Sequence, residues 1–264
     1  MASSFCFQKT VRMAIWGGLI SAACFSFVAH ADTPTLGVGI SKLTYREPSL
    51  DVTHDAWLPT VQAQWAPDNL QLGSWPIGFV GMWAQGQGHY SGTGTMEGQP
   101  IQLWQIQVQS VQTAWLEGYL LTPSLGYRQF DNDARGFTST GEQGYRRTSE
   151  YWFAGLGIEQ SLANGWRWNG QLRYLLAGRQ TTNLGDVSGD VGKIGTVKNA
   201  QHRGYGLNLG VCHTMNALDV CPSVEYWRIS ESDTVSARVN GNNYLMSEPA
   251  NTTKTFQLMI HHKF

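Results

Sequence analysis

Alternation of apolar and polar residues over short segments is the feature that most constrains the fold of this chain. The last ten residues, TFQLMIHHKF, place Phe256, Leu258, Ile260, His262 and Phe264 in one set and mostly polar residues in the other. A period of two is typical of a β-strand whose two faces meet different surroundings. We therefore expect a strand that ends with the chain, and the question is which solvent its apolar face meets.

The same alternation recurs along the chain, and the connections between the segments vary regularly in length. We expect ten strands, at 36–46, 57–65, 75–86, 103–115, 119–130, 151–162, 166–179, 203–215, 218–229 and 254–264. Short connections (66–74, the step from 115 to 119, 163–165 and 216–217) alternate with long polar ones (47–56, 87–102, 131–150, 180–202 and 230–253). This asymmetry favours an all-β chain folded as a transmembrane, up-and-down antiparallel barrel, with short turns at one end and long loops at the other. Eight or twelve strands remain alternatives.

The N-terminal segment has the features of a secretory signal. Lys9 and Arg12 are the only charges in residues 1–31, an apolar run covers 13–28, and Ala29-His30-Ala31 provides small residues for cleavage. We expect a cleaved signal peptide at 1–31 and a barrel domain at 32–264. A membrane-anchoring helix, or a lipoprotein modified at Cys24, fits the sequence less well. Loss of two cations takes the formal charge from -1 to -3, and nothing indicates nucleic-acid binding or a cofactor.

The two faces of the expected strands differ in a way that suits a lipid-facing barrel. In 166–176 one face holds Trp166, Trp168, Leu172, Tyr174 and Leu176, while the other holds Arg167, Asn169, Gln171 and Arg173. Segments 203–213 and 104–109 likewise oppose apolar residues to Gly, Asn and Gln. An aromatic-edged apolar face against a polar one is expected of an outer-membrane barrel. A soluble, lipocalin-like barrel has the opposite polarity, and phase alone leaves it open.

The terminal strand resembles the C-terminal signature of bacterial outer-membrane β-barrel proteins. Phe264 ends the chain, and Phe256, Leu258 and Ile260 alternate before it, although His262 replaces the usual aromatic or aliphatic residue. The resemblance implies a bacterial outer-membrane location, with outer-membrane lipid and lipopolysaccharide as surroundings. It also implies that the barrel assembly machinery reads this strand and that periplasmic chaperones deliver the chain. Pairing of the last strand with the first would leave no edge in lipid.

Two cysteines of the expected barrel are placed to form a disulfide. In VCHTMNALDVC, a two-residue turn at Asn216-Ala217 sets Cys212 opposite Cys221, with both side chains on the inner face. Cross-strand partners lie within disulfide range, and the periplasm is oxidising. Two free thiols are the alternative. Metal binding with His213 is disfavoured because that side chain should point outward, and Ala217 suits a tight primed turn poorly.

Charged residues on the inner face define a candidate lumen network. They are Arg128, Glu159, Arg167, Arg173 and Glu225. Charges in a narrow lumen must be paired or hydrated, so we expect mutual ion pairs. A selectivity filter is the alternative interpretation, and it would make the barrel a narrow, porin-like channel.

The expected outer rim holds the residues that could support catalysis. Asp131 and Asp133 end the fifth segment, His202 opens the eighth, and His54 and His89 lie near other rim positions. The topology is similar to that of the omptins, ten-stranded surface proteases that activate water with a carboxylate pair and an Asp–His pair. The D-x-D here lies in the third outer connection, not the second, and no D-x-H element is found. We expect no enzyme and no metal site.

The long connections are the remaining candidates for a functional site. They carry Tyr145, Arg146, Arg147 and Tyr244, which are residue types that anchor interfaces. Loops on a rigid scaffold often hold binding sites, although they could also only shield the barrel mouth. The sequence thus predicts a non-enzymatic surface protein that binds an extracellular ligand of unknown identity or modifies surface properties. A narrow pore and a rim hydrolase of omptin kind are the alternatives.

Overall fold

The computed structural model describes residues 34–110, 112–113 and 118–264. The expected signal peptide at 1–31, the end of the fourth expected strand and the turn near Trp115 lie outside these residues. The described chain forms a closed antiparallel barrel of ten strands. The strands are β1 (Thr35–Glu47), β2 (Val52–Trp65), β4 (Trp75–Ser91), β5 (Thr95–Ser110), β7 (Tyr119–Phe137), β8 (Gln143–Ser161), β9 (Trp166–Asn183), β11 (Gly204–Met215), β12 (Leu218–Ile229) and β15 (Asn251–Lys263).

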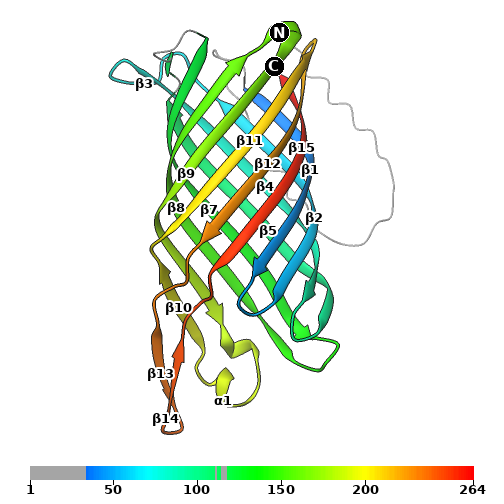
Figure 1. The fold of residues 1–264 in the computed structure, drawn as a ribbon, viewed down its shortest axis with the longest axis vertical. Coiled ribbons are helices and arrows are strands. Elements are labelled where there is room, and N and C mark those ends of the chain that lie inside the picture. Colours follow the sequence, from blue (N-terminus) through cyan, green and yellow to red (C-terminus); the bar gives the residue numbers. More distant parts are fainter. Residues whose placement is uncertain (1–33, 111, 114–117) are drawn as a thin grey trace, which may run out of the picture. The chain divides into compact units, whose positions relative to one another are not determined.

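The ring closes between the last strand and the first, as predicted. β15 pairs with β12 on one side and with β1 on the other, all antiparallel (Figure 1). The register places Thr35 opposite Lys263, so the first described residues and the C-terminus lie at one end of the barrel, called here the inner end. Closure satisfies every strand edge by pairing, which is the condition for a sheet to cross lipid.

Shorter elements lie at the two ends of the barrel. They are β3 (Gln71–Leu72), β6 (Gln112–Thr113), η1 (Ala163–Gly165), η2 (Leu184–Asp186), α1 (Gly189–Gly192), β10 (Thr196–Gln201), β13 (Val235–Val239) and β14 (Asn242–Met246). The β13–β14 hairpin and α1 project at the end opposite the C-terminus, called here the outer end (Figure 1). Among the described residues, no helix has the length and apolar character to cross a membrane.

At the outer end the strands run further than the sequence predicted. Residues 131–150 were expected to be a loop, but β7 and β8 pair through Phe137 and Gln143. Likewise β4 continues to Ser91, and β5 begins at Thr95. Beyond the membrane both faces of a strand meet polar surroundings, so the alternation fades while the backbone pairing continues. Most of the expected outer loops are therefore β-hairpins.

The outer surface carries a lipid belt, defined by outward apolar residues on every strand. Its middle includes Val38, Val61, Ile106, Leu156 and Leu209, all exposed. An outer aromatic row bounds it, formed by Trp57, Trp83, Trp104, Tyr127, Trp152, Tyr174, Tyr205 and Tyr226. Neighbours in this row touch: Tyr127 lies 4.9 Å from Trp104 and 5.0 Å from Trp152, ring centre to ring centre. An aromatic row at the edge of an apolar band is a feature of a lipid-facing barrel.

Glycines on the inner face make room for large side chains on the neighbouring strands. A Cβ added to Gly126 would lie 2.3 Å from the Phe153 ring, and one added to Gly206 would lie 2.8 Å from the Trp227 ring. The inner face that the sequence marks as rich in glycine is thus a surface against which aromatic rings pack.

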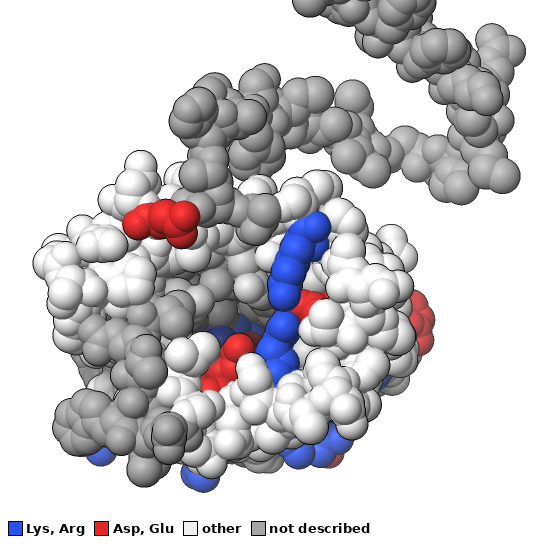
Figure 2. Space-filling view, turned by 90° about the horizontal axis from the view of Figure 1, so that it is seen from above, with Lys and Arg blue, Asp and Glu red and all other residues white. Residues whose placement is uncertain are grey.

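Two apolar clusters, together called here the apolar layer, lie inside the lumen at the height of the outer aromatic row, and the sequence did not predict them. One cluster joins Leu43, Tyr45, Ala56, Leu58, Ala84, Ile101, Leu103 and Phe130, and a second joins Tyr151, Phe153, Leu175, Trp227 and Ile229. Several inward residues of the clusters are sequence neighbours of outward rings in the aromatic row, so the clusters and the row lie at the same height. Leu58 follows Trp57, and Phe153 follows Trp152. Towards the inner end lies a polar cavity of about 240 Å³ lined by many Gln side chains. Figure 2 looks into this end, which is hollowed, with charged side chains inside.

Candidate functional site

Three of the predicted lumen residues meet directly on the inner side of the apolar layer. Arg173 donates through Nη1 to Glu225 Oε2, and Arg128 Nε lies 3.9 Å from Glu225 Oε1. Trp227 Nε1 also donates to Glu225 Oε1, at 2.9 Å. All are buried, with Arg128 only 1% exposed. Two guanidinium groups therefore share one carboxylate inside the barrel.

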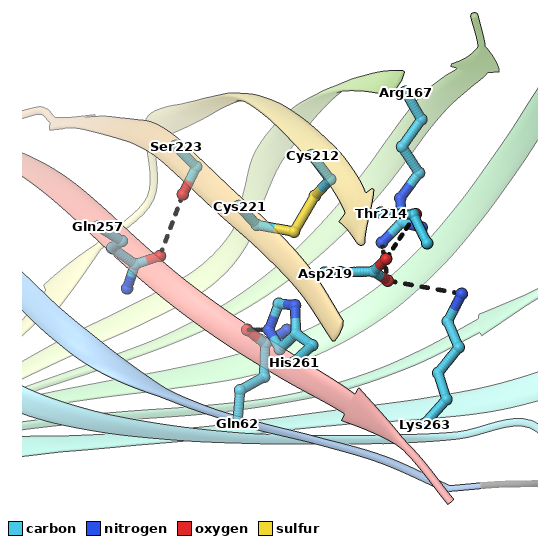
Figure 3. The surroundings of a disulfide bond; sticks show 10 residues. All are labelled: Gln62, Arg167, Cys212, Thr214, Asp219, Cys221, Ser223, Gln257, His261 and Lys263. Carbon is cyan, nitrogen blue, oxygen red and sulfur yellow. Dashed lines mark hydrogen bonds and ion pairs between the residues drawn. A yellow bond between two sulfur atoms is a disulfide. The ribbon is translucent and has the colours of Figure 1, made fainter. Parts of the chain in front are cut away.

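A second ionic group lies near the inner end. Arg167 Nη2 donates to Asp219 Oδ2 at 2.7 Å, and Lys263 Nζ lies 3.5 Å from the same oxygen (Figure 3). Thr214 Oγ1 donates to the other oxygen of Asp219 at 2.6 Å. Sequence reasoning placed Arg167 in the lumen but missed Asp219, which has the same inward phase. Glu159 lines the polar cavity as predicted.

The disulfide between Cys212 and Cys221 is present, as predicted. The two Cα atoms are 4.2 Å apart, and the sulfur atoms lie on the inner face beside the Asp219 group (Figure 3). At the turn, only Asn216 has a positive φ, of 56°, so Ala217 escapes the strained conformation that a primed turn would impose. His213 points outward against the Trp166 ring, with ring centres 4.5 Å apart.

The rim candidates for catalysis do not converge. Asp131 and Asp133 lie within β7, not in a loop, and alternate with inward Phe130 and Asn132, so they face outward. Asp131 accepts from Thr148 Oγ1 at 2.6 Å, and the Arg135 guanidinium, 2.6 Å from Asp133, lowers the pKa of that carboxyl.

The candidate base is far from these carboxylates. His202 follows β10, and β10 pairs with β9, so it lies about three strand spacings, or about 14 Å, from β7. His89 is held by Glu97 at 2.6 Å. Within the described residues, no group of three or more His, Cys, Asp or Glu side chains could hold a metal ion.

The outer end of the lumen contains a pocket of about 340 Å³, called here the outer pocket. It lies on the outer side of the apolar layer, among the hairpins that join β1 to β2, β4 to β5 and β7 to β8. Its wall includes Glu47, Leu50, Val52, His54, Tyr90, Met96, Gln99, Asn132, Glu142, Tyr145 and Arg147. The lining is thus mixed, with aliphatic and aromatic groups around a polar floor, as in many small-molecule sites.

His54 forms part of that floor in its neutral form. It lies three residues before Trp57 in the sequence, nearer the outer end of β2 and outside the lipid belt, and it is 3% exposed. Burial lowers the pKa of His54 to about 4. Its Nδ1 lies 3.0 Å from Gln99 Oε1, and Asn132 Nδ2 lies 3.0 Å from Nδ1 and 3.2 Å from Nε2; a ring with Nδ1–H donates to Gln99 and leaves Nε2 to accept from Asn132. Because both ring nitrogens are engaged, His54 is a fixed polar element of the pocket.

An ionic group lies at the floor and extends behind it, since Glu47 and Arg147 line the pocket and Glu248 does not. Glu47 accepts hydrogen bonds from Arg147 and from Tyr45 Oη, the latter at 2.7 Å. Glu248, from the connection before β15, folds back into the mouth, with its Oε2 3.4 Å from Arg147 Nη2. Gln180 Nε2 donates to the same Glu248 oxygen at 2.8 Å.

The sequence placed Arg147 wrongly, in an exposed loop. It is an interior residue of β8, whereas its neighbour Arg146 faces outward and is exposed. The only signal was its even spacing from the inward Tyr151 and Phe153, in a stretch too polar to show alternation.

Comparison with known proteins shows similarity of fold but no match of sequence. No protein-family model and no curated protein matches the sequence. Among solved structures, the outer membrane protease OmpT from Escherichia coli matches with a TM-score of 0.52 and 12% identity, over 88% of this chain and 96% of that one. Neisserial surface protein A gives 0.41 and 9% (88% and 97%), and the beta domain of the Bordetella autotransporter BrkA gives 0.46 and 14% (89% and 100%).

The closed ring and the lipid belt, with the likeness of fold to OmpT, define the class of protein. It is a transmembrane β-barrel of the bacterial outer-membrane type, which places the chain in that membrane.

Proposed function

We propose that this protein is a non-enzymatic surface barrel that binds an extracellular partner at its outer end, and that its lumen does not conduct. The observation that carries the proposal is the apolar layer, in which Leu58, Leu103 and Phe153 are fully buried at the height of the outer aromatic row. Buried apolar side chains of this kind oppose the passage of hydrated ions, whose desolvation is costly.

The build of the outer end supports a binding role. Paired strands continue past the lipid belt, so the hairpins form a firm platform. The β13–β14 hairpin presents Leu245, which is 76% exposed, and the half-buried Tyr244. Apolar and aromatic groups on a rigid scaffold suit partner binding. A catalytic role receives no such support, since activation of water requires a base and carboxylates that converge.

The membrane partners expected from the sequence fit the outer surface. Just beyond the lipid belt, Arg228 lies in register with Thr252, and Thr252 with Arg46, while Lys254 lies in register with Thr44. The three cations are exposed. We propose that they contact phosphate groups of lipopolysaccharide, because cations attract phosphates at a membrane surface.

The terminal strand retains its proposed role in assembly. Phe256, Leu258 and Ile260 on β15, and Phe264 directly after it, all face outward and are exposed. This row is available to the barrel assembly machinery and to periplasmic chaperones while the ring is still open. Replacement of Phe264 by Ala would then slow insertion in cells, and an unchanged insertion rate would remove this part of the proposal.

Two measurements test the proposed function. In planar bilayers, the signal-free protein should insert without steady conductance, and a steady, salt-dependent current would favour the narrow pore instead. Removal of residues 235–246 should abolish attachment of bacteria that display the protein to a panel of hydrophobic, anionic and protein-coated surfaces. The far-UV circular dichroism of the shortened barrel should stay that of a β-sheet. Undiminished attachment would contradict binding by this hairpin.

A further inference from the structure

We propose that the outer pocket binds a small organic cation, an ammonium group carried on an apolar body of about one ring. This inference goes beyond binding by the outer hairpins, since it concerns an enclosed site inside the mouth. The volume of about 340 Å³ lies near the lower end of the range for small-molecule sites, which sets the size of the ligand.

The charge balance of the pocket floor favours a cation. Glu47 lines the pocket and pairs with Arg147, and Glu248 pairs with the same Arg147 from outside the lining, so two carboxylates share one guanidinium. Both carboxyl groups accept hydrogen bonds from several donors. His54 is neutral and adds no positive charge. Glu142, at the exposed rim, adds a further negative charge. Net negative charge held away from water is relieved by a bound positive group.

Unpartnered polar atoms on the same floor indicate where the cation would be held. Within the described residues, Glu47 Oε2 and Asn132 Oδ1 have no hydrogen-bond partner. Both side chains are buried, at 1% and 3% exposure, and both residues line the pocket. Buried acceptors without donors are costly, so a ligand that brings N–H groups would gain by serving them. Of the unpartnered buried atoms on residues that line this pocket, Arg147 Nε is the single donor.

The rest of the lining suits an apolar body next to the charge. Leu50, Val52 and Met96 provide aliphatic surface, and Tyr90 and Tyr145 provide aromatic faces. Aromatic faces attract cations in addition to burying carbon. An anion of the same shape would instead meet Glu47 at the floor and Glu142 at the rim.

The test is a calorimetric titration of the folded, signal-free barrel in lipid nanodiscs. The probe is 2-phenylethylamine at neutral pH, and 3-phenylpropionate is the matched anion of similar size. We expect saturable binding of the amine and at least tenfold weaker binding of the carboxylate. Empty nanodiscs give the correction for partition into lipid.

Variants locate the site. Glu47→Gln removes the charge from the floor and should weaken amine binding at least tenfold. Glu159→Gln makes the same change at the inner end and should leave it unchanged. Val52→Trp fills the pocket, keeps every charge and should abolish binding, so the test stands even if Glu47→Gln fails to fold. Absence of saturable binding, equal binding of amine and carboxylate, or unchanged binding in Val52→Trp would overturn the proposal. Loss of the β13–β14 hairpin should not affect the titration, which separates this inference from the proposed function.

Discussion

Cys212 and Cys221 face each other across β11 and β12, with their Cα atoms 4.2 Å apart and their sulfur atoms joined inside the barrel. The bond closes a short hairpin beside the ionic group of Arg167 and Asp219 (Figure 3). It therefore fixes the turn at the inner end, where neighbouring strands carry charges that must stay in register.

Replacement of both cysteines by Ala should lower the free energy of unfolding by about 2–3 kcal/mol, the loop-closure value for a short loop. Urea titration followed by tryptophan fluorescence measures the change. In the unmodified, signal-free protein, thiol alkylation should label neither cysteine before reduction and both after it. Labelling without reductant would contradict the disulfide.

Removal of the shared carboxylate should destabilise the barrel strongly. In Glu225→Ala, Arg128 and Arg173 would be left buried without a counter-charge, which typically costs about 3–5 kcal/mol. The matched control is Glu150→Ala, which breaks the 2.6 Å pair with Arg179 on the outer surface and should cost less than about 1 kcal/mol. Equal effects in the same urea titration would show that the interior network is hydrated and weak.

The position of the lipid belt predicts where a charge is tolerated. Leu209 lies midway between Tyr205 and His213 on the outer face of β11, so Leu209→Arg should cost about 2–4 kcal/mol. Leu245→Arg, on the hairpin beyond the belt, should be close to neutral. The comparison is made by folding into vesicles at graded urea concentrations. Equal tolerance at both positions would be inconsistent with the assigned belt.

Acid should weaken the outer pocket through His54. The folded pKa of about 4 lies below the ordinary value of 6.5, so the unfolded chain takes up a proton first as pH falls. Stability attributable to His54 is therefore complete above about pH 6.5 and declines towards pH 4, by about 2 kcal/mol at pH 5. His54→Gln should remove this pH dependence, whereas His202→Gln, at an exposed position, should retain it. Identical pH profiles for the two variants would be evidence against a buried neutral His54.

Much of the barrel could be predicted because the two faces of a membrane strand differ in polarity, and the sequence shows this as alternation of apolar and polar residues. Lipid demands apolar residues at every second position, and Leu207, Leu209 and Val211 supplied that signal. The disulfide followed from a two-residue turn, and the closure of the ring followed from the terminal strand. The inward phase of Arg128, Arg173 and Glu225 was equally legible.

The outer end could not be read in the same way. There both faces of each strand meet water or polar groups, so no period of two marks the strands, and β7 beyond Phe130 was interpreted as a loop. Because the alternation is lost there, the sequence led us to predict a rim site at Asp131 and an exposed loop at Arg147.

The sequence by itself determined which face of each strand is apolar and which is polar, because that choice is made residue by residue along one strand. Only the tertiary structure decided what fills the lumen, because the filling depends on which side chains reach the same height from different strands. Leu58 and Leu103 meet Phe130 only through the stagger of the ring, and Glu248 reaches Arg147 only because a connection folds back into the mouth. Contacts between residues so far apart in the chain leave no local pattern, and the apolar layer and the outer pocket are both made of them.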